Sequence, residues 1–352
     1  ERGLERQTMS KIEEKAGCGL PTIRWGILGA GKNSGKFAAD HCEAKASEVV
    51  AVAARDLERA REFAAKHGIR SAYGSYEELV SRPEVDIVYI GTVNSEHYRL
   101  TKMALLAGKP VLCEKPFTMH AEQTAELIEL ARKRGLFLME GIWTRCFPII
   151  QEVRSFLADR ERAGRPMMAQ MDFGFVGGNA PSRRLYNPAL GGGALADVGI
   201  YLLSTACFYL GKIVDFRAYA VLSDEGIDTR ITISARHESG ALSLLSAAID
   251  AVTPREATIC SEKALIHIPC PFWKAPKAII HHHGGESGSS PTERVEVIER
   301  PYRGNGFRYE IDSVNDCLRS GKKECEWMPL KDTYELALLM DKIRAECHIR
   351  TS

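Results

Sequence analysis

The fold is decided by the stretch Thr22-Ile23-Arg24-Trp25-Gly26-Ile27-Leu28-Gly29-Ala30-Gly31-Lys32-Asn33-Ser34. Its first seven residues have the apolar character of a short buried strand, and the glycines that follow predict a tight turn. A helix is expected from Lys36 to Cys42, a second strand from Val49 to Ala54 and a second helix from Leu57 to His67. This order predicts a βαβ unit at the beginning of a parallel sheet.

Gly29 and Gly31 form a Gly-x-Gly turn between the predicted strand and helix. The first glycine permits the turn, the second lets backbone N–H groups approach a pyrophosphate, and the helix N-terminus adds a positive dipole. Ser34 stands where a third glycine is usual, at a position that governs helix packing more than phosphate contact. A purely structural turn is the alternative, but the flanking elements favour a dinucleotide site. The predicted cofactor contacts are Gly29, Gly31, Lys32, Asn33 and Ser34.

The end of the second strand, Ala53-Ala54-Arg55-Asp56, distinguishes the two nicotinamide dinucleotides. An acidic residue there binds the ribose 2′-hydroxyl of NAD, whereas an arginine accommodates the 2′-phosphate of NADP. Arg55 comes first and is able to stack on adenine and pair with a phosphate, which favours NADP. Asp56 is able to bind the ribose of NAD, so NAD stays the alternative. If Arg55 and Asp56 simply begin the next helix, with Asp56 as its N-cap, the sequence is compatible with either cofactor.

The alternation of strands and helices continues to residue 140. It predicts six strands in a parallel, doubly wound sheet, in which ligands bind at the carboxyl ends of the strands. Thr92, Asn94 and His97 follow the fourth strand and are predicted to contact the cofactor or, for His97, its ribose or the substrate. A histidine without a ligand at the start of a helix is the alternative for His97.

Glu114-Lys115-Pro116 follows the fifth strand on the same side of the sheet. Proline disfavours a helical conformation for Lys115, so its ammonium group is held at the end of the strand, beside the expected nicotinamide. Glu114 and Lys115 are therefore predicted to lie at the cofactor, although most lysines in proteins are simply on the surface.

After Trp143 the pattern changes to consecutive segments with a period of two, which predict an antiparallel or mixed sheet. An apolar helix from Ala194 to Leu210 is expected to cover one face. The predicted strands are 167–175, 214–222, 230–236, 241–249 and 256–268, the last broken near residue 263. The fold class is therefore α/β, with a tail over 1–20, a Rossmann domain over 21–143 and an α+β substrate-binding domain over 144–352. The C-terminal helix is a candidate to pack back on the first domain.

The stretch from Asn187 to Tyr201 contains three consecutive glycines, at 191–193, that predict a sharp turn before the apolar helix. Asp197 and Tyr201 lie one turn apart on the same face of that helix. A carboxylate and a phenol on a mostly apolar helix are difficult to explain by packing alone. Both are therefore predicted to belong to an active site.

Trp143 and Arg145 lie at the expected domain boundary and are candidates for the substrate pocket, with a core tryptophan as an equal alternative for Trp143. The run His281-His282-His283 has no Cys, Asp or Glu at ligand spacing. It is assigned to a Gly/Ser/His-rich loop over 281–291, and no metal site is predicted.

The composition limits the classes of partner. Of the 352 residues, 45% are hydrophobic and 26% charged, as in globular proteins, and the length favours two domains. A net charge of +1 provides no basic surface for nucleic acid or for a membrane, and neither partner is expected. No apolar run approaches the ~18 residues of a membrane span, and the first twenty residues lack the apolar core of a signal peptide. Ten cysteines without a Cys-x-x-Cys pair are expected to be reduced thiols in the cytoplasm.

Four motifs together resemble the glucose-fructose oxidoreductase / inositol dehydrogenase family. The resemblance extends from about Thr22 to the C-terminus, and residues 138–145 with Tyr201 look most like its dimeric dihydrodiol dehydrogenase / NADP-dependent D-xylose dehydrogenase branch. Many members carry histidine where this chain has Tyr201. The motifs are Gly29-Ala30-Gly31, Gly91-Thr92-Val93-Asn94-Ser95-Glu96-His97, Cys113-Glu114-Lys115-Pro116 and Gly191-Gly192-Gly193-Ala194-Leu195-Ala196-Asp197-Val198-Gly199-Ile200-Tyr201.

The resemblance implies an NAD(P)-binding Rossmann domain followed by a domain whose large open, mostly antiparallel sheet commonly forms an oligomer interface, here a homodimer. It also implies a cis Lys115–Pro116 peptide bond. In one departure, the chain reads Ser223-Asp224-Glu225-Gly226 where this branch tends to be basic. That difference leaves the preference for substrate charge or shape open.

The implied reaction is hydride transfer between C4 of a nicotinamide and a hydroxyl-bearing carbon of a sugar or cyclic diol, such as a D-xylose-like aldose or a trans-dihydrodiol. Tyr201 is predicted to be the general acid/base, and Lys115 its electrostatic partner, which depresses the pKa of the phenol and binds the substrate hydroxyl. Asp197 would orient the substrate or Lys115. The alternatives are a non-catalytic NAD(P)-binding regulator, and a ketosugar reductase or redox-assisted glycosidase on the same scaffold.

Overall fold

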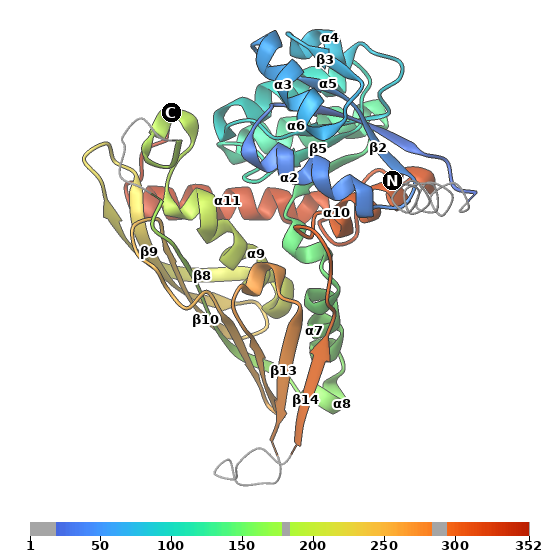
Figure 1. The fold of residues 1–352 in the computed structure, drawn as a ribbon. Coiled ribbons are helices and arrows are strands. Elements are labelled where there is room, and N and C mark those ends of the chain that lie inside the picture. The colour runs from blue at the N-terminus through green and yellow to red at the C-terminus, as the bar shows by residue number, and fades with distance from the viewer. Residues whose placement is uncertain (1–18, 178–183, 284–293, 352) are drawn as a thin grey trace.

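The computed structural model describes residues 19–177, 184–283 and 294–351. Most of the expected tail over 1–20 and of the expected loop over 281–291 lies outside these residues. Figure 1 shows a sheet flanked by helices above a large twisted sheet, with α10 (Arg308–Arg319) and α11 (Leu330–Glu346) between the two.

The first sheet is parallel and has the predicted doubly wound form, with the strand order β3-β2-β1-β4-β5-β6. The order reverses between β1 and β4, and ligands bind at such a switch point, beyond the carboxyl ends of the strands. Its strands are β1 (Ile23–Leu28), β2 (Ser47–Ala53), β3 (Ser71–Tyr73), β4 (Ile87–Ile90), β5 (Val111–Glu114) and β6 (Leu138–Gly141).

Helices cover both faces of this sheet, and the helix predicted from Leu57 to His67 has the predicted bounds. The helices are α2 (Lys32–Asp40), α3 (Leu57–His67), α4 (Tyr76–Val80), α5 (His97–Leu106) and α6 (Ala121–Arg134). The first, α2, begins four residues before the predicted start at Lys36, because Gly31 is its N-cap in an extended conformation. The turn of the Gly-x-Gly motif therefore leads directly into a helix N-terminus.

The second sheet has eight strands in the order β14-β13-β12-β11-β7-β10-β9-β8 and is antiparallel except for the β7–β10 pair. The strands β13 and β14 were not predicted. His281 and His282 lie on β13, opposite Val295 and Arg294 of β14, so their assignment to a loop is wrong. The strands are β7 (Pro166–Gly174), β8 (Ile213–Leu222), β9 (Asp228–His237), β10 (Leu242–Ala248), β11 (Ala257–Ser261), β12 (Ala264–Ile268), β13 (Lys277–His282) and β14 (Arg294–Glu299).

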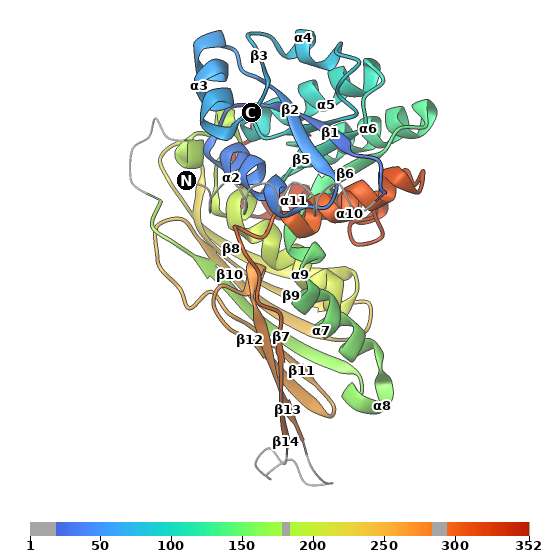
Figure 2. The ribbon, with the colours of Figure 1, turned by 45° about the vertical axis from the view of Figure 1, so that its right-hand side comes forward.

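Helices lie on one face of this large sheet, as Figure 2 shows for α7 (Pro148–Ala158) and α9 (Ile200–Leu210). The predicted single helix over 194–210 is instead a π-helical segment, Leu195–Gly199, that continues into α9. By length and composition Pro188–Leu210 would suffice to cross a membrane, but 89% of its most apolar window is buried in the protein. It is a core helix, and its π-helical turn carries Asp197, a type of irregularity that is frequent at functional sites.

Candidate functional site

A groove of about 640 Å³ follows the carboxyl ends of β1, β2 and β4. At its base Gly29 has φ +104°, and a Cβ atom there would lie 2.9 Å from Cγ2 of Thr92 and 3.0 Å from the carbonyl oxygen of Gly91. No side chain caps the N-terminus of α2, so its first N–H groups, from Lys32 onward, remain available to an anion. These features fit the diphosphate of a dinucleotide.

Two arginines line the groove at the end of β2, and the sequence had indicated only Arg55. The second is Arg59, whose Nη2 donates a hydrogen bond to the carbonyl oxygen of Ala30 at 3.2 Å. Between them Asp56 is the N-cap of α3, and its Oδ1 accepts from the N–H groups of Glu58 at 2.9 Å and Arg59 at 3.4 Å. The carboxylate of Asp56, which had kept NAD as an alternative, is thus engaged in capping α3. The four-residue spacing of Arg55 and Arg59 across the start of α3 is the sequence signal that would have indicated the second arginine.

Of the three residues predicted to bind the cofactor after β4, only Thr92 lines the groove. Asn94 is buried and donates from Nδ2 to the carbonyl oxygen of Gly191 at 2.7 Å. His97 is fully buried, and its Nδ1 lies 2.8 Å from the carbonyl oxygen of Pro116. Burial lowers the pKa of His97 to about 4, so the ring is neutral. Contrary to the prediction, Asn94 and His97 brace the loops around the site and do not face a cofactor.

Lys115, Asp197 and Tyr201 come together between the two sheets. The Lys115–Pro116 peptide bond is cis, as the family resemblance implied. Nζ of Lys115 donates to the carbonyl oxygen of Asp197 at 2.5 Å and lies 3.6 Å from its Oδ1. The same Nζ lies 4.8 Å from the centroid of the Tyr201 ring. The hydroxyl of Tyr201 accepts a hydrogen bond from Nε1 of Trp143 at 2.8 Å.

The electrostatics of this cluster differ from the expectation for Tyr201. Burial raises the pKa of the Tyr201 phenol well above its ordinary value, and the carboxylate of Glu114 acts in the same direction. The ammonium group of Lys115 lies over the face of the ring. The expected depression of the tyrosine pKa is therefore wrong for this arrangement, and the phenol is protonated.

The group of this cluster whose pKa moves toward neutral pH is Lys115. Burial lowers the pKa of the Lys115 ammonium group, and the neighbouring Arg184 guanidinium adds to the effect, although Asp197 and Glu114 oppose it. Burial alone would raise the pKa of Asp197, but the cations of Lys115 and Arg184 hold that pKa below its usual value. Burial also raises the pKa of Glu114, whose Oε1 accepts from the Tyr89 hydroxyl at 2.7 Å. Of the three residues of the cluster, Lys115 is thus the one whose pKa is shifted toward neutral pH, which suits it to exchange a proton.

Trp143 and Arg145 have different positions. Trp143 stacks on Phe307 with ring centroids 4.5 Å apart and lines a small cavity beside Tyr201 and Glu114. Arg145 is buried on the other side of its short helical turn, where Nε donates to Oγ of Ser204 at 2.8 Å and Nη1 to Asp332 at 2.6 Å. Arg145 therefore fastens η3 (Trp143–Cys146) to α9 and α11, and its assignment to the substrate pocket is wrong.

Arg184 is a functional candidate that the sequence gave no reason to select. It lines the dinucleotide groove, and its Nη2 donates to Oδ1 of Asp197 at 2.6 Å. The pattern around it has no recognisable motif, because its role depends on how the chain after β7 returns toward the first sheet.

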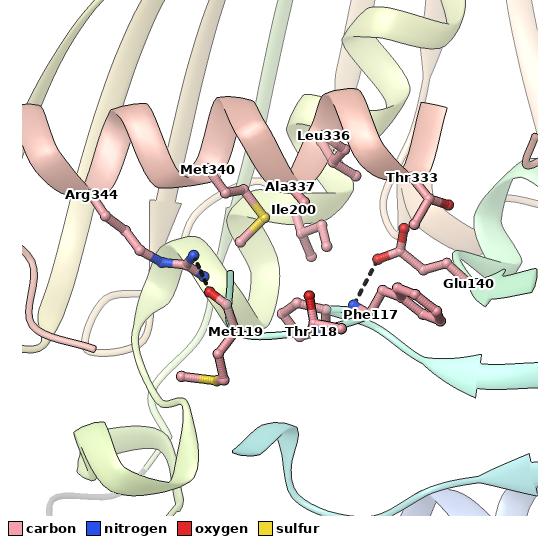
Figure 3. Close-up of a pocket in the computed structure, with 11 residues that line it drawn as sticks. Phe117, Thr118, Met119, Glu140, Ile200, Thr333, Leu336, Ala337, Met340 and Arg344 are labelled. Atoms are coloured by element: carbon pink, nitrogen blue, oxygen red, sulfur yellow. Dashed lines mark hydrogen bonds between the residues drawn. The ribbon is translucent and has the colours of Figure 1, made fainter. Parts of the chain in front are cut away.

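The segment that follows Lys115, Phe117 to Met119, is held from behind by β6 and by the last helix, as Figure 3 shows. Oε1 of the buried Glu140 accepts a hydrogen bond from the backbone N–H of Phe117 at 3.0 Å. Nη1 of Arg344, on α11, donates to the carbonyl oxygen of Met119 at 2.9 Å. These two bonds fix the backbone on the far side of the cis-proline.

Glu140→Gln is expected to make stability less dependent on pH. Burial raises the pKa of Glu140 from 4.5 to about 7, so the folded protein retains a proton that the unfolded chain loses, and unfolding becomes easier as the pH rises between these values. Moving a carboxyl pKa that far corresponds to about 3 kcal/mol of unfolding free energy. Urea unfolding of both proteins at pH 5 and pH 8 checks this: they should be alike at pH 5, with the variant more stable at pH 8. Parallel losses of stability would contradict it.

A family model described as "Oxidoreductase family, NAD-binding Rossmann fold" matches residues 23–142, and one for the "GFO/IDH/MocA C-terminal domain" matches residues 150–267. The trans-1,2-dihydrobenzene-1,2-diol dehydrogenase of Xenopus tropicalis is 36% identical over 326 residues, which cover 91% of this chain and 96% of that protein.

Two solved structures share the fold. A 3-ketoreductase from Actinomadura kijaniata, in complex with NADP and TDP-benzene, has a TM-score of 0.79 at 24% identity, with 93% of this chain and 98% of that chain covered. Levoglucosan dehydrogenase, in complex with NADH and levoglucosan, has a TM-score of 0.83 at 16% identity, with 93% and 97% covered.

Proposed function

Because the chain belongs to the GFO/IDH/MocA family of NAD(P)-dependent oxidoreductases, we propose that it uses NADP to oxidise a hydroxyl-bearing carbon of a sugar or a cyclic diol. The observation that carries the proposal is the convergence of Lys115, Asp197 and Tyr201 beside the dinucleotide groove. The similarity to the dihydrodiol dehydrogenase from Xenopus tropicalis supports a trans-dihydrodiol as the substrate, and a D-xylose-like aldose is the second candidate, from the sequence resemblance.

The bound nicotinamide would supply the acceptor for the hydride, and the protein's own residues handle the proton. Since the indole N–H of Trp143 already donates to the Tyr201 oxygen, the hydrogen of the phenol is directed elsewhere and is available to a substrate oxygen. Burial favours the neutral amine of Lys115, which accepts the proton that leaves the hydroxyl and so becomes an ammonium group. Asp197 keeps the ammonium group in place through its backbone and side-chain oxygens.

A substrate panel tests the function. The protein is incubated with NADP and with D-xylose, other aldoses, inositols and trans-dihydrodiols, and NADPH is followed by its absorbance. NADPH formation with an aldose or a diol is expected. Bound NADP without turnover of any compound would favour the alternative of an NAD(P)-binding regulator, and turnover only of ketosugars with NADPH would favour a reductase.

The preference for NADP rests on Arg55 and Arg59, and the double variant Arg55→Ala/Arg59→Ala is expected to bind NADP roughly 10²- to 10⁴-fold more weakly. Each guanidinium would lose a charge-assisted bond to the 2′-phosphate, worth about 1.5–3 kcal/mol. The affinity for NAD, which lacks this phosphate, should stay within about twofold. Fluorescence titration with NADPH and NADH measures both, and an equal loss of the two affinities would contradict this assignment.

We also propose that the protein is a cytoplasmic homodimer built through the uncovered face of the large sheet. Leu242 and Leu244 on β10, and Val295 and Val297 on β14, are exposed apolar residues of that domain. Eight cysteines of the described residues, Cys42 not counted, are free thiols, which suits a reducing compartment. Sedimentation velocity gives the mass in solution, and Leu244→Glu is expected to shift it to the monomer.

A further inference from the structure

Arg184 belongs to two sites at once. The other residues that line the dinucleotide groove lie between positions 29 and 96, in the first sheet and its helices. Arg184 comes from the second domain, at the start of η4 (Arg184–Tyr186), and reaches the same groove. Its guanidinium simultaneously binds the carboxylate of Asp197 in the catalytic cluster.

In the structure this carboxylate is shared by two cations. Oδ1 of Asp197 lies 2.6 Å from Nη2 of Arg184 and 3.6 Å from Nζ of Lys115, so the arginine has the shorter contact. The Lys115 and Asp197 side chains are only 9% and 14% exposed, whereas that of Arg184 is 34% exposed. Of the three groups, Arg184 is the one that a ligand in the groove can reach.

The groove is built for an anion, because the uncapped N-terminus of α2 and the Gly29 turn face it. A diphosphate is a stronger attraction for a guanidinium than a carboxylate already shared with a lysine, because it carries two charges and accepts paired N–H bonds. We propose that Arg184 is a clamp from the second domain on the diphosphate of the dinucleotide, and that binding there releases Asp197 to Lys115.

This inference rests on the proposed use of NADP and adds a consequence for the reaction. Arg184 is a positioning residue, since it acts on the proton-transferring group through Asp197. When the guanidinium moves to the diphosphate, Oδ1 of Asp197 is left to pair with Lys115 alone. The cofactor therefore completes the catalytic pair, and the substrate binds productively only after it.

The test compares Arg184→Gln with the unmodified full-length protein in isothermal titration calorimetry with three ligands. These are NADP, 2′-phospho-ADP-ribose, which keeps the diphosphate without the nicotinamide, and 2′-AMP, which lacks the diphosphate. Loss of the charged bonds in Arg184→Gln is expected to weaken the binding of NADP and of 2′-phospho-ADP-ribose by about tenfold or more. The affinity for 2′-AMP should stay within about twofold of the parent value. Arg184→Lys should retain part of the affinity, because it keeps the charge without the fork.

Arg61→Gln is the matched control, since Arg61 pairs with Glu58 on the surface of α3 and does not line the groove. It removes the same charge and should change none of the three affinities. Parental affinities of Arg184→Gln for all three ligands, with a lower turnover, would overturn the proposal, because Arg184 would then act only as a fixed partner of Asp197. A loss confined to NADP would overturn it too, by placing the contact at the nicotinamide end. If the unmodified protein fails to bind NADP, the proposed function itself is wrong.

Discussion

Replacing Lys115 by methionine is expected to lower kcat roughly 10³-fold while the protein stays folded and continues to bind NADP. Loss of a positioned acid/base typically costs a factor of about 10² to 10⁴. Lys115 also supplies the cation nearest the Tyr201 ring, and the methionine replaces neither role. Steady-state NADPH formation with the best substrate of the panel, measured from pH 6 to pH 10, gives the effect.

The design of this variant separates chemistry from folding. Methionine has nearly the length of lysine, and in the protein without a dinucleotide Asp197 is not left alone, because Arg184 pairs with it at 2.6 Å. A buried ammonium group is costly to desolvate, so its removal should not lower the unfolding midpoint. Turnover within tenfold of the parent, in a protein of parental stability and NADP affinity, would show that Lys115 does not transfer the proton.

Tyr201→Phe is expected to reduce kcat roughly 10²-fold. The variant should keep the rise of kcat with pH, and this rise should begin at the same pH as in the parent protein. If Lys115 is the base, the rise reports its deprotonation and persists in the variant. If a Tyr201 phenolate were the base, the rise would disappear. The raised pKa of the buried phenol supports the first outcome. The measurement is kcat against pH for both proteins, with Trp143→Phe as the matched control.

Trp143→Phe removes the indole donor and leaves the phenol in place. It should therefore lower kcat less than Tyr201→Phe does, because the Tyr201 hydroxyl still reaches the substrate oxygen. A variant of Tyr201 with parental kcat would exclude the phenol from catalysis. A larger loss in Trp143→Phe than in Tyr201→Phe would show that the tryptophan acts mainly as a wall of the cavity and not through its hydrogen bond.

Much of the fold was predictable because its signals are local. The apolar run before Gly29 and the helix from Leu57 to His67 need only neighbouring residues to be recognised. The two strands that escaped prediction, β13 and β14, are stabilised chiefly by pairing with each other and with β12. The His281–His283 run looked like a loop because the sequence next to it does not show the partner strand.

The candidate site was predictable only where topology fixes it. Lys115 follows a parallel strand, so the rule for the carboxyl ends of strands placed it at the crevice. Arg184 and Arg344 act through contacts across 13 and 225 positions of the chain, which no local pattern reveals. His97 and Arg145 show the opposite error, since a polar residue beside a site often supports it from behind. For Tyr201 the sequence indicated proximity to a cation but not which part of the ring the cation touches.

The attachment of α11 to the cis-proline loop has a consequence for how the protein comes into being. Arg344 and Asp341 hold the backbone of residues 119 and 121, in the domain that leaves the ribosome first. During synthesis, the first domain is complete long before these two side chains exist. The catalytic lysine acquires its support only when the end of the chain emerges. Nascent chains are therefore expected to turn over a substrate only after this last helix has docked.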